Sequence, residues 1–566
     1  MKAFRHFLCR KEQVTLYLPH AVSSFFRLSL FLPLALLAAL TSCSGPGGPP
    51  PDLRNGNIAL DFAGGDGSAA DPWRISTGAQ LAYLAQEVNA GNTYSGEYVT
   101  LTGDLDLDGR EWTAIGTYSP SRPFSGVFDG AGHVIYNLSI NTEPAADYQG
   151  LFGYLNGAAI QKIGLENVDV TGKNYVGGIA GYVNTGSIAD SYSTGTVSGT
   201  DNWVGGVAGL VDTGSITDSY STGTVSGKRY VGGVAGWVYS GSIKDSYSTG
   251  TVSGTSSCVG GVAGLVDIGS IADSYSTGNV SGTDECVGGI AGLVNTGSIT
   301  DSYSTGNVSG DYDVGGIAGL IQTNSSIEDS YSSGTVCGTS EVGGVAGVVV
   351  SVGSSSSITD SYSTGDVSGT SHYVGGVAGQ VYSDAGSSSI ADSYSTGTVS
   401  GTSEVGGVAG VVSSNTGGSS SIADSYSTGN VSGTANVGGV AGQVYSSGGS
   451  CSGSIENSYS TGTVSGDSSV GGVAGLIQTN SSIENSYSTG TASGTSEVGG
   501  VVGDTYSSSS IAYCAALNPW VKAATDYAGR VVGSIGGIGT NTVDNNVAWN
   551  LMGTNGGVAF NTNPDN

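Results

Sequence analysis

The chain has 566 residues, of which 99 are glycine, and its formal net charge is −29 at pH 7. It contains no lysine or arginine between Lys244 and Lys522. Nucleic-acid binding requires cations against the phosphates, so it is excluded for most of the chain. Binding of anionic lipids or acidic glycans through a basic patch is excluded for the same reason.

The first element in chain order, residues 1–43, has the pattern of an export signal. Basic residues precede an apolar run at positions 28–40, which ends in Leu40-Thr41-Ser42-Cys43. This run of about 13 residues is shorter than the ~20 needed to span a membrane. The last four residues resemble the lipobox of bacterial lipoproteins, which implies that Cys43 is acylated and becomes the first mature residue. The alternative is an ordinary cleaved signal.

Residues 44–56 are predicted to form a tether. Positions 44–51 read SGPGGPPP, a composition typical of a flexible, partly extended linker. Acyl chains on Cys43 would supply the anchor, so no other membrane segment is needed. We therefore expect an exported protein, held at the outer membrane or cell surface by its lipid.

A repeat dominates residues 150–518. Its consensus is V-G-G-[VI]-A-G-x-V, then S-I-x-D-S-Y-S-T-G, then x-V-S-G. The V-G-G element begins at Val176, Val204, Val231, Val259, Val287, Val314, Val342, Val374, Val405, Val437, Val470 and Val498. Each unit contains three short β-type runs bounded by Gly, Ser, Asn or Asp. One unit therefore predicts one coil of an all-β, right-handed parallel β-helix, and a dozen coils stacked ~4.8 Å apart would form a rod of roughly 60 Å.

The orientation of the tract around Tyr192 follows from the divergent end coils. Ile163 and Leu165 occupy the two serine positions in the first coil, which predicts that Ser191 and Ser193 point inward. Because strand side chains alternate, the tyrosines of all the coils then form an outward column. A column of core tyrosines is the alternative.

An aspartate recurs just before this tract, from Asp190 to Asp424, and becomes Asn457 and Asn485 in later coils. Asp and Asn close turns by bonding to their own backbone, so we interpret the column as a bend. Calcium ligation is the less favoured alternative, because the chain lacks the nine-residue G-G-x-G-x-D pattern of calcium-binding solenoids.

A solenoid must cover its terminal coils. Residues 57–149 contain the one good helix signal, at 79–88, with Thr77 and Gln80 in a capping-box arrangement, and predict a small α+β N-terminal cap with the first coils. Residues 519–566 are predicted to cap the other end. Four coils carry Ser/Gly-rich inserts at 351–357, 383–389, 413–421 and 446–453, which should project together from one corner. Such a corner is often a binding face, but drift of a low-complexity sequence explains it equally well.

The repeats are similar to the GLUG-motif repeats of bacterial surface proteins. The similarity rests on G-L-F-G-Y-L at 150–155, the repeated V-G-G-V-A-G, and S-I-x-D-S-Y-S-T-G. It implies a β-helical, adhesin-like surface protein without a defined ligand. Some immunoglobulin A1 peptidases carry such repeats beside a zinc protease domain, which needs H-E-x-x-H. Only His133 and His372 follow the signal, so that activity cannot be carried over.

Two groups of residues stand out at the position before V-G-G. Cys258 and Cys286 share this position on consecutive coils, within disulfide range, and export permits oxidation, so we predict a bridge. Tyr175, Trp203 and Tyr230 would form an aromatic strip on three coils. The position varies elsewhere, which suggests exposure, and exposed aromatic rings can stack on sugars. A patch packed under a loop is the alternative.

The leading functional hypothesis is an adhesin-like binding rod for a glycan or a host or matrix protein. A surface scaffold or spacer without a specific ligand is the main alternative. A polysaccharide-degrading β-helix enzyme is less favoured, because the carboxylates follow the repeat instead of clustering irregularly. Ice binding by the Thr196/Ser198 column is weakened by Asn279 and Asp366, which interrupt it. We expect no catalysis, no cofactor and no metal.

Overall fold

One repeat closes one turn of a solenoid, because each short β run ends at a residue that bends the chain. The coil of residues 202–227 is typical. Its strands are β14 (Asn202–Gly205), β15 (Ala208–Val211), β16 (Ser215–Thr217), β17 (Tyr220–Ser221) and β18 (Thr224–Gly227). The V-G-G-V-A-G segment was expected to be one β run, but it is divided between β14 and β15, which belong to different sheets. The coils therefore build four sheets, not three.

The computed structural model describes residues 58–141, 146–447, 449–525, 528–537 and 540–549. All of them belong to one unit, Pro51–Asn566. The predicted signal, Cys43 and the tether lie outside the described residues, as do the last residues of the predicted C-terminal cap. Among the residues described, no helix has the length and hydropathy needed to cross a membrane.

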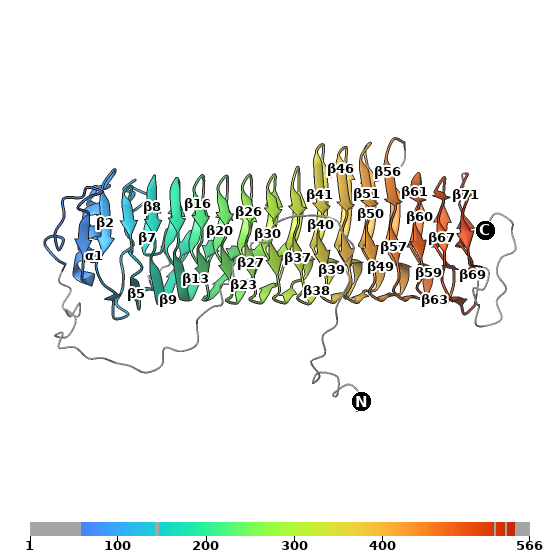
Figure 1. The fold of residues 1–566 in the computed structure, drawn as a ribbon, viewed down its shortest axis with the longest axis horizontal. Helices are drawn as coiled ribbons and strands as arrows, with labels where there is room; N and C mark the ends of the chain where they lie inside the picture. Colours follow the sequence, from blue (N-terminus) through green and yellow to red (C-terminus); the bar gives the residue numbers. More distant parts are fainter. Residues whose placement is uncertain (1–57, 142–145, 448, 526–527, 538–539, 550–566) are drawn as a thin grey trace, which may run out of the picture. The chain divides into compact units, whose positions relative to one another are not determined.

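Strands stack in parallel from coil to coil. Val204, for example, pairs with Val231 at the same position of the next coil. One sheet of 17 strands contains both β1 (Trp73–Ile75), near one end of the described residues, and β71 (Thr542–Asp544), near the other end, where Figure 1 labels it. The described residues thus form an all-β parallel β-solenoid of about 17 turns. The expected dozen was too low, because coils at both ends lack the V-G-G element.

Aliphatic columns run through the solenoid and form its core. In the coil of residues 202–227, Val204, Val207, Ala208, Val211 and Ile216 are all fully buried. The corresponding residues of the following coils are buried in the same way. Each coil thus gains its apolar contacts from its two neighbours, as a solenoid requires.

The serine–tyrosine–serine tract has the orientation predicted from the sequence. Ser219 and Ser221 are buried, whereas Tyr220 between them is partly exposed. The outward rings form a tyrosine ladder, in which consecutive rings stack at 4.6–5.1 Å with interplanar angles of 2–7°. The ladder comprises Tyr192, Tyr220, Tyr247, Tyr275, Tyr303, Tyr331, Tyr362, Tyr394, Tyr426, Tyr459 and Tyr487.

The aspartate column marks a bend, as predicted. Its residues, from Asp190 to Asp424, and their successors Asn457 and Asn485 have φ between 47° and 51°. Aspartate and asparagine are enriched among the non-glycine residues found in this left-handed region. The repeat therefore uses them to turn the chain between two sheets.

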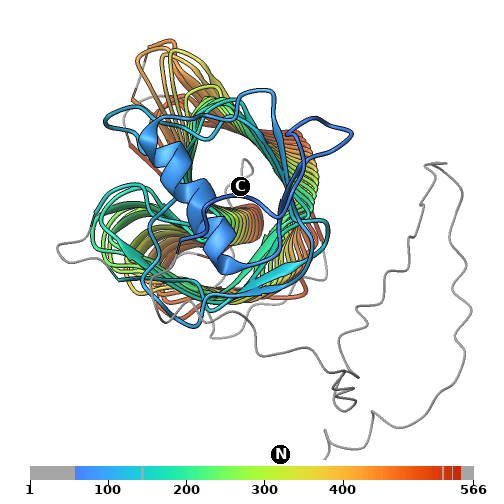
Figure 2. The same cartoon turned by 90° about the vertical axis from the view of Figure 1, so that its left-hand side faces the viewer.

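The N-terminal end carries the helix α1 (Gly78–Ala90), which lies across the end of the coils (Figure 2). The Thr77 hydroxyl accepts the N–H of Gln80, and Gly91 ends the helix with φ 117°. Leu81, Leu84 and Val88, which belong to the inner face of this helix, are fully buried. The first coils contain β2 (Tyr98–Leu101), β3 (Leu105–Asp106), β4 (Val127–Asp129), β5 (Val134–Tyr136) and β6 (Ser139–Asn141).

In the described residues, the Ser/Gly-rich inserts extend the strands on either side of one corner. They lengthen β40 (Ala346–Val352) and β41 (Ser355–Thr359), β45 (Ala378–Asp384) and β46 (Ser387–Ala391), β50 (Ala409–Asn415) and β51 (Ser419–Ala423), and β55 (Ala441–Ser446) and β56 (Ser452–Glu456). These four hairpins project side by side from one edge of the solenoid (Figure 1), and we call them the fin. Buried serines line its interior, where the Ser388 hydroxyl donates to that of Ser351 at 2.9 Å.

Candidate binding surfaces

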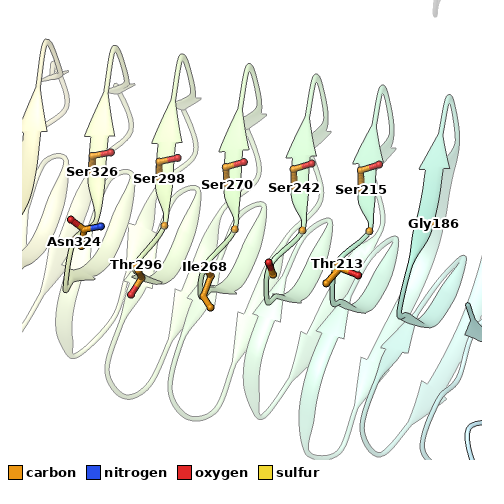
Figure 3. Close-up of a pocket in the computed structure, with 15 residues that line it drawn as sticks. Gly186, Thr213, Ser215, Ser242, Ile268, Ser270, Thr296, Ser298, Asn324 and Ser326 are labelled. Carbon is orange, nitrogen blue, oxygen red and sulfur yellow. The ribbon is translucent and has the colours of Figure 1, made fainter. Parts of the chain in front are cut away.

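A groove of about 560 Å³ runs along the corner between the sheets of β15 and β16, across successive coils (Figure 3). Its floor consists of glycines, namely Gly186, Gly214, Gly241, Gly269 and Gly297. One wall is a serine column, Ser215, Ser242, Ser270, Ser298 and Ser326. The other wall consists of Thr213, Ser240, Ile268, Thr296 and Asn324. The groove was not predicted from the sequence.

The glycines on the floor of the groove lie close to the backbone of the preceding coil, which leaves no room for a side chain. A Cβ on Gly241 would lie 2.3 Å from the carbonyl oxygen of Gly214, and one on Gly269 would lie 2.5 Å from that of Gly241. Real Cβ atoms do not approach a carbonyl so closely, so a side chain at either position would require the backbone to shift.

The groove is uncharged, although the chain carries a formal net charge of −29. Its walls offer hydroxyl groups and one amide, together with the Ile268 side chain, which is 54% exposed. Such a surface has no electrostatic preference for an ionic ligand. It can exchange hydrogen bonds with a neutral, hydroxyl-rich chain or with a peptide backbone.

The groove meets the fin at its C-terminal end. Ser326 belongs to β36 (Ser326–Glu328), which pairs with β41 of the first fin hairpin. The next coil after the groove is therefore the first lengthened coil. The fin rises where the groove stops, so a ligand lying along the groove would meet a wall at that end.

Tyr175, Trp203 and Tyr230, singled out from the sequence, are brought together in one stack. The ring centroids of Tyr175 and Trp203 are 4.5 Å apart, and those of Trp203 and Tyr230 are 6.1 Å apart. Trp203 therefore has an aromatic ring on each side. Its ring faces are covered by its neighbours, which leaves its edge, and not its face, for a ligand.

The stack contains more rings than the three predicted from the sequence. Tyr148 stacks on Tyr175 at 4.6 Å, and Tyr118 stacks on Tyr148 at 4.9 Å. A second row lies beside this aromatic column and consists of Tyr154, Tyr182 and Trp237. A signal for Tyr148 was present, because it precedes Gln149-Gly150 as Tyr175 precedes Val176-Gly177.

The prediction that the position before V-G-G is exposed was wrong. Tyr175, Trp203 and Tyr230 are only partly exposed, and Cys258 and Cys286 are 4% and 5% exposed. Residues at this position adopt φ between 46° and 62°, at a corner of the coil. Each side chain lies beside the same position of the adjacent coils. Neighbours therefore cover one another even where the residue type changes.

Cys258 and Cys286 are neighbours on consecutive coils. The N–H of Val259 donates to the carbonyl of Cys286 at 2.9 Å, which fixes the two positions side by side. Both thiols are free in this structure, so the bridge stays a prediction. The pKa of the Cys286 thiol is raised by its hydrogen bond with Cys258 and by burial.

Asp313 continues the same column. Its carboxylate lies 3.8 Å from the Cys286 sulfur. Burial, with repulsion from Glu341 and Glu285, raises the pKa of Asp313 to about 7. Neighbouring coils thus place two ionisable side chains, Cys286 and Asp313, in an environment that disfavours their charged forms.

The aspartate column shows no metal geometry. The Lys244 ammonium lies 3.5 Å from the Asp273 carboxylate and 3.8 Å from that of Asp245. Burial and repulsion by Asp273 and Asp329 raise the pKa of Asp301. Among the described residues, no group of three or more His, Cys, Asp or Glu side chains could hold a metal ion.

Comparison with known families identifies the repeat. The model of the GLUG motif matches residues 172–198, 204–226, 227–253, 255–281, 283–309, 310–336, 370–400 and 466–493. GLUG motifs therefore recur across residues 172–493 of this chain. The sequence-based assignment is thus confirmed.

Two further similarities accompany the GLUG repeats. The GLUG-repeat chain is 32% identical over 143 residues to halomucin of Haloquadratum walsbyi, a match that covers 24% of this chain and 2% of halomucin. It therefore spans a small fraction of that protein. A crystal structure of a proposed immunoglobulin A1 protease from Bacteroides ovatus is similar with a TM-score of 0.38 and 26% identity, over 44% of this chain and 80% of the other.

Proposed function

We propose that this GLUG-repeat protein is an adhesin-like binding rod at the cell surface, which holds a glycan or a host or matrix protein along its groove. The groove itself is the observation that carries this proposal. It is long, uncharged and rich in hydroxyl groups, and it ends against the fin. A repeated surface of this kind suits an extended ligand that makes the same weak contacts on successive coils.

Cell-surface attachment rests on the N-terminal sequence. Leu40-Thr41-Ser42-Cys43 supports a lipid anchor at Cys43, followed by a tether that would hold the solenoid away from the membrane. We further propose a right-handed coil, the hand preferred by parallel strand crossovers. The position of α1 across the first coils supports a cap, which would keep the end of the rod from pairing with another chain.

We propose that the protein is not an enzyme. Its carboxylates follow the repeat, and the aspartate column is used to bend the chain. A hydrolase would instead place two carboxylates at a specific separation beside the substrate.

A surface scaffold without a specific ligand remains the second candidate. It is favoured by the stack of Tyr175, Trp203 and Tyr230, because these rings cover one another and act as a packed patch. In that case the rod would separate other surface components, and the groove would stay unoccupied.

An array of glycans and extracellular-matrix proteins tests the two candidates. The binding rod should give a saturable signal that falls at least about tenfold when Ser270→Lys places a charge in the groove wall. Thr251→Lys, on another face, is the matched control and should leave binding unchanged. Absence of any saturable signal at high protein concentration, or equal effects of the two substitutions, would exclude the groove as the binding surface.

A further inference from the structure

Tyr118 ends the aromatic column in the described part of the chain. One of its faces stacks on Tyr148 with ring centroids 4.9 Å apart, and Tyr154 packs edge-on at 5.3 Å. Tyr118 nevertheless remains 46% exposed. In contrast to Trp203, which has a ring on each side, Tyr118 has one stacked partner, Tyr148, while Tyr182 lies at 5.8 Å with its ring tilted by 42°.

The exposed side of Tyr118 borders a pocket of about 350 Å³. Its polar lining includes the carboxylates of Glu111 and Asp147 and the hydroxyl of Thr113, all on exposed residues. Glu111 accepts the N–H of Asn141 at 3.0 Å, and Asp147 accepts the side-chain amide of Asn174 at 2.8 Å. These bonds orient the two carboxylates but use only part of their capacity to accept hydrogen bonds.

An aromatic face flanked by strong hydrogen-bond acceptors matches a pyranose ring, which has C–H groups on its face and hydroxyl groups at its rim. The C–H groups on one face of a sugar pack against the negative face of an aromatic ring. The hydroxyl groups at its rim donate to carboxylates, which are the strongest acceptors among side chains. The volume is at the small end of the range for ligand pockets, so it suits one or two sugar residues.

The negative charge of the pocket limits which sugars can bind there. Glu111 and Asp147 repel uronic acids, sialic acids and sulfated sugars, and the chain as a whole is strongly acidic. We propose that this pocket binds a neutral pyranose residue, which stacks on the exposed side of Tyr118 and donates its hydroxyls to Glu111 and Asp147. The site is separate from the groove, whose lining residues come from other positions of the repeat.

Titration of the purified full chain with methyl glycosides of glucose, galactose and N-acetylglucosamine, followed by saturation-transfer NMR, tests the proposal. At least one glycoside should bind saturably. Tyr118→Ala should weaken that binding at least about tenfold, whereas Tyr118→Phe, which keeps the ring face, should stay within about threefold. Tyr487→Ala, at the far end of the tyrosine ladder, is the matched control and should not change the affinity.

Three results would overturn the proposal. The first is no saturable binding of any glycoside, and the second is equal binding by the wild type and Tyr118→Ala. The third is binding of choline in place of every glycoside, which would identify a site for organic cations. Circular dichroism of each variant establishes that it is folded. Because the probes are single sugars, the result does not depend on the groove.

Discussion

Ser274 and Ser302, on consecutive coils, are joined by a hydrogen bond in which the N–H of Ser274 donates to the hydroxyl of Ser302 at 3.2 Å. That hydroxyl in turn donates to the carbonyl of Thr300 at 2.7 Å. The second serine of the tract differs, because the buried hydroxyl of Ser304 has no partner within the described residues. Two buried serines, separated only by Tyr303, therefore have different energetic roles.

Ser302→Ala should lower the free energy of unfolding by about 1–3 kcal/mol, because it leaves the buried N–H of Ser274 without a partner. Ser304→Ala removes a buried hydroxyl that has no bond, and should be neutral or slightly stabilising. Urea denaturation of the two variants and the wild type measures the difference. Equal losses in both variants would contradict this assignment of the two serines.

The fold could be predicted because the sequence repeats one coil many times. The inward direction of the serines followed from Ile163 and Leu165, which stand in the serine positions of a divergent coil and are fully buried. The bend at Asp190 followed from the recurrence of Asp or Asn at this position in successive coils, since both residue types close turns. Both arguments need only local alternation and comparison between coils.

The surfaces were harder to predict, because they depend on how separate columns lie side by side. To predict the groove, one would need to know that the sheets of β15 and β16 meet at a corner whose floor includes Gly214 and Gly241. The exposed side of Tyr118 depends on a non-repeating loop. The Ser/Gly-rich inserts were expected to project from one corner, but their composition did not indicate that pairing with neighbouring coils would make many of these residues part of strands.

Gly241→Ala should destabilise the solenoid by about 2 kcal/mol or more, because the new Cβ would lie 2.3 Å from the Gly214 carbonyl oxygen. Gly103→Ala is the matched control, since a Cβ there meets nothing within 4 Å. It should change stability by no more than about 0.5 kcal/mol. Thermal or urea unfolding of both variants tests the pair. A fully stable Gly241→Ala would show that the coils separate more easily than their close contact implies.

Exported protein should contain a disulfide between Cys258 and Cys286, because the two positions are adjacent in an oxidising compartment. Peptide mapping without reduction should recover the two cysteines as one linked peptide. Reduction should lower the unfolding temperature of the wild type but not that of Cys258→Ser. Recovery of both thiols in free form from exported protein would refute the bridge.

Stability should fall as pH rises from about 4 to about 7, because of Asp313. Its native pKa of about 7 lies above the ordinary value of 3.8. In this window the native state therefore holds a proton that the unfolded state has released, so the free energy of unfolding decreases with pH and then levels off. Asp313→Asn removes this loss and should be more stable than the wild type at pH 8, by about 1–4 kcal/mol, but not at pH 4. Urea unfolding at both pH values measures the difference.

Asp311→Asn, at an exposed aspartate nearby, serves as the control and should have the same stability as the wild type at both pH values. If Asp313→Asn also follows the wild type at both pH values, the Asp313 carboxylate is not destabilised by its surroundings.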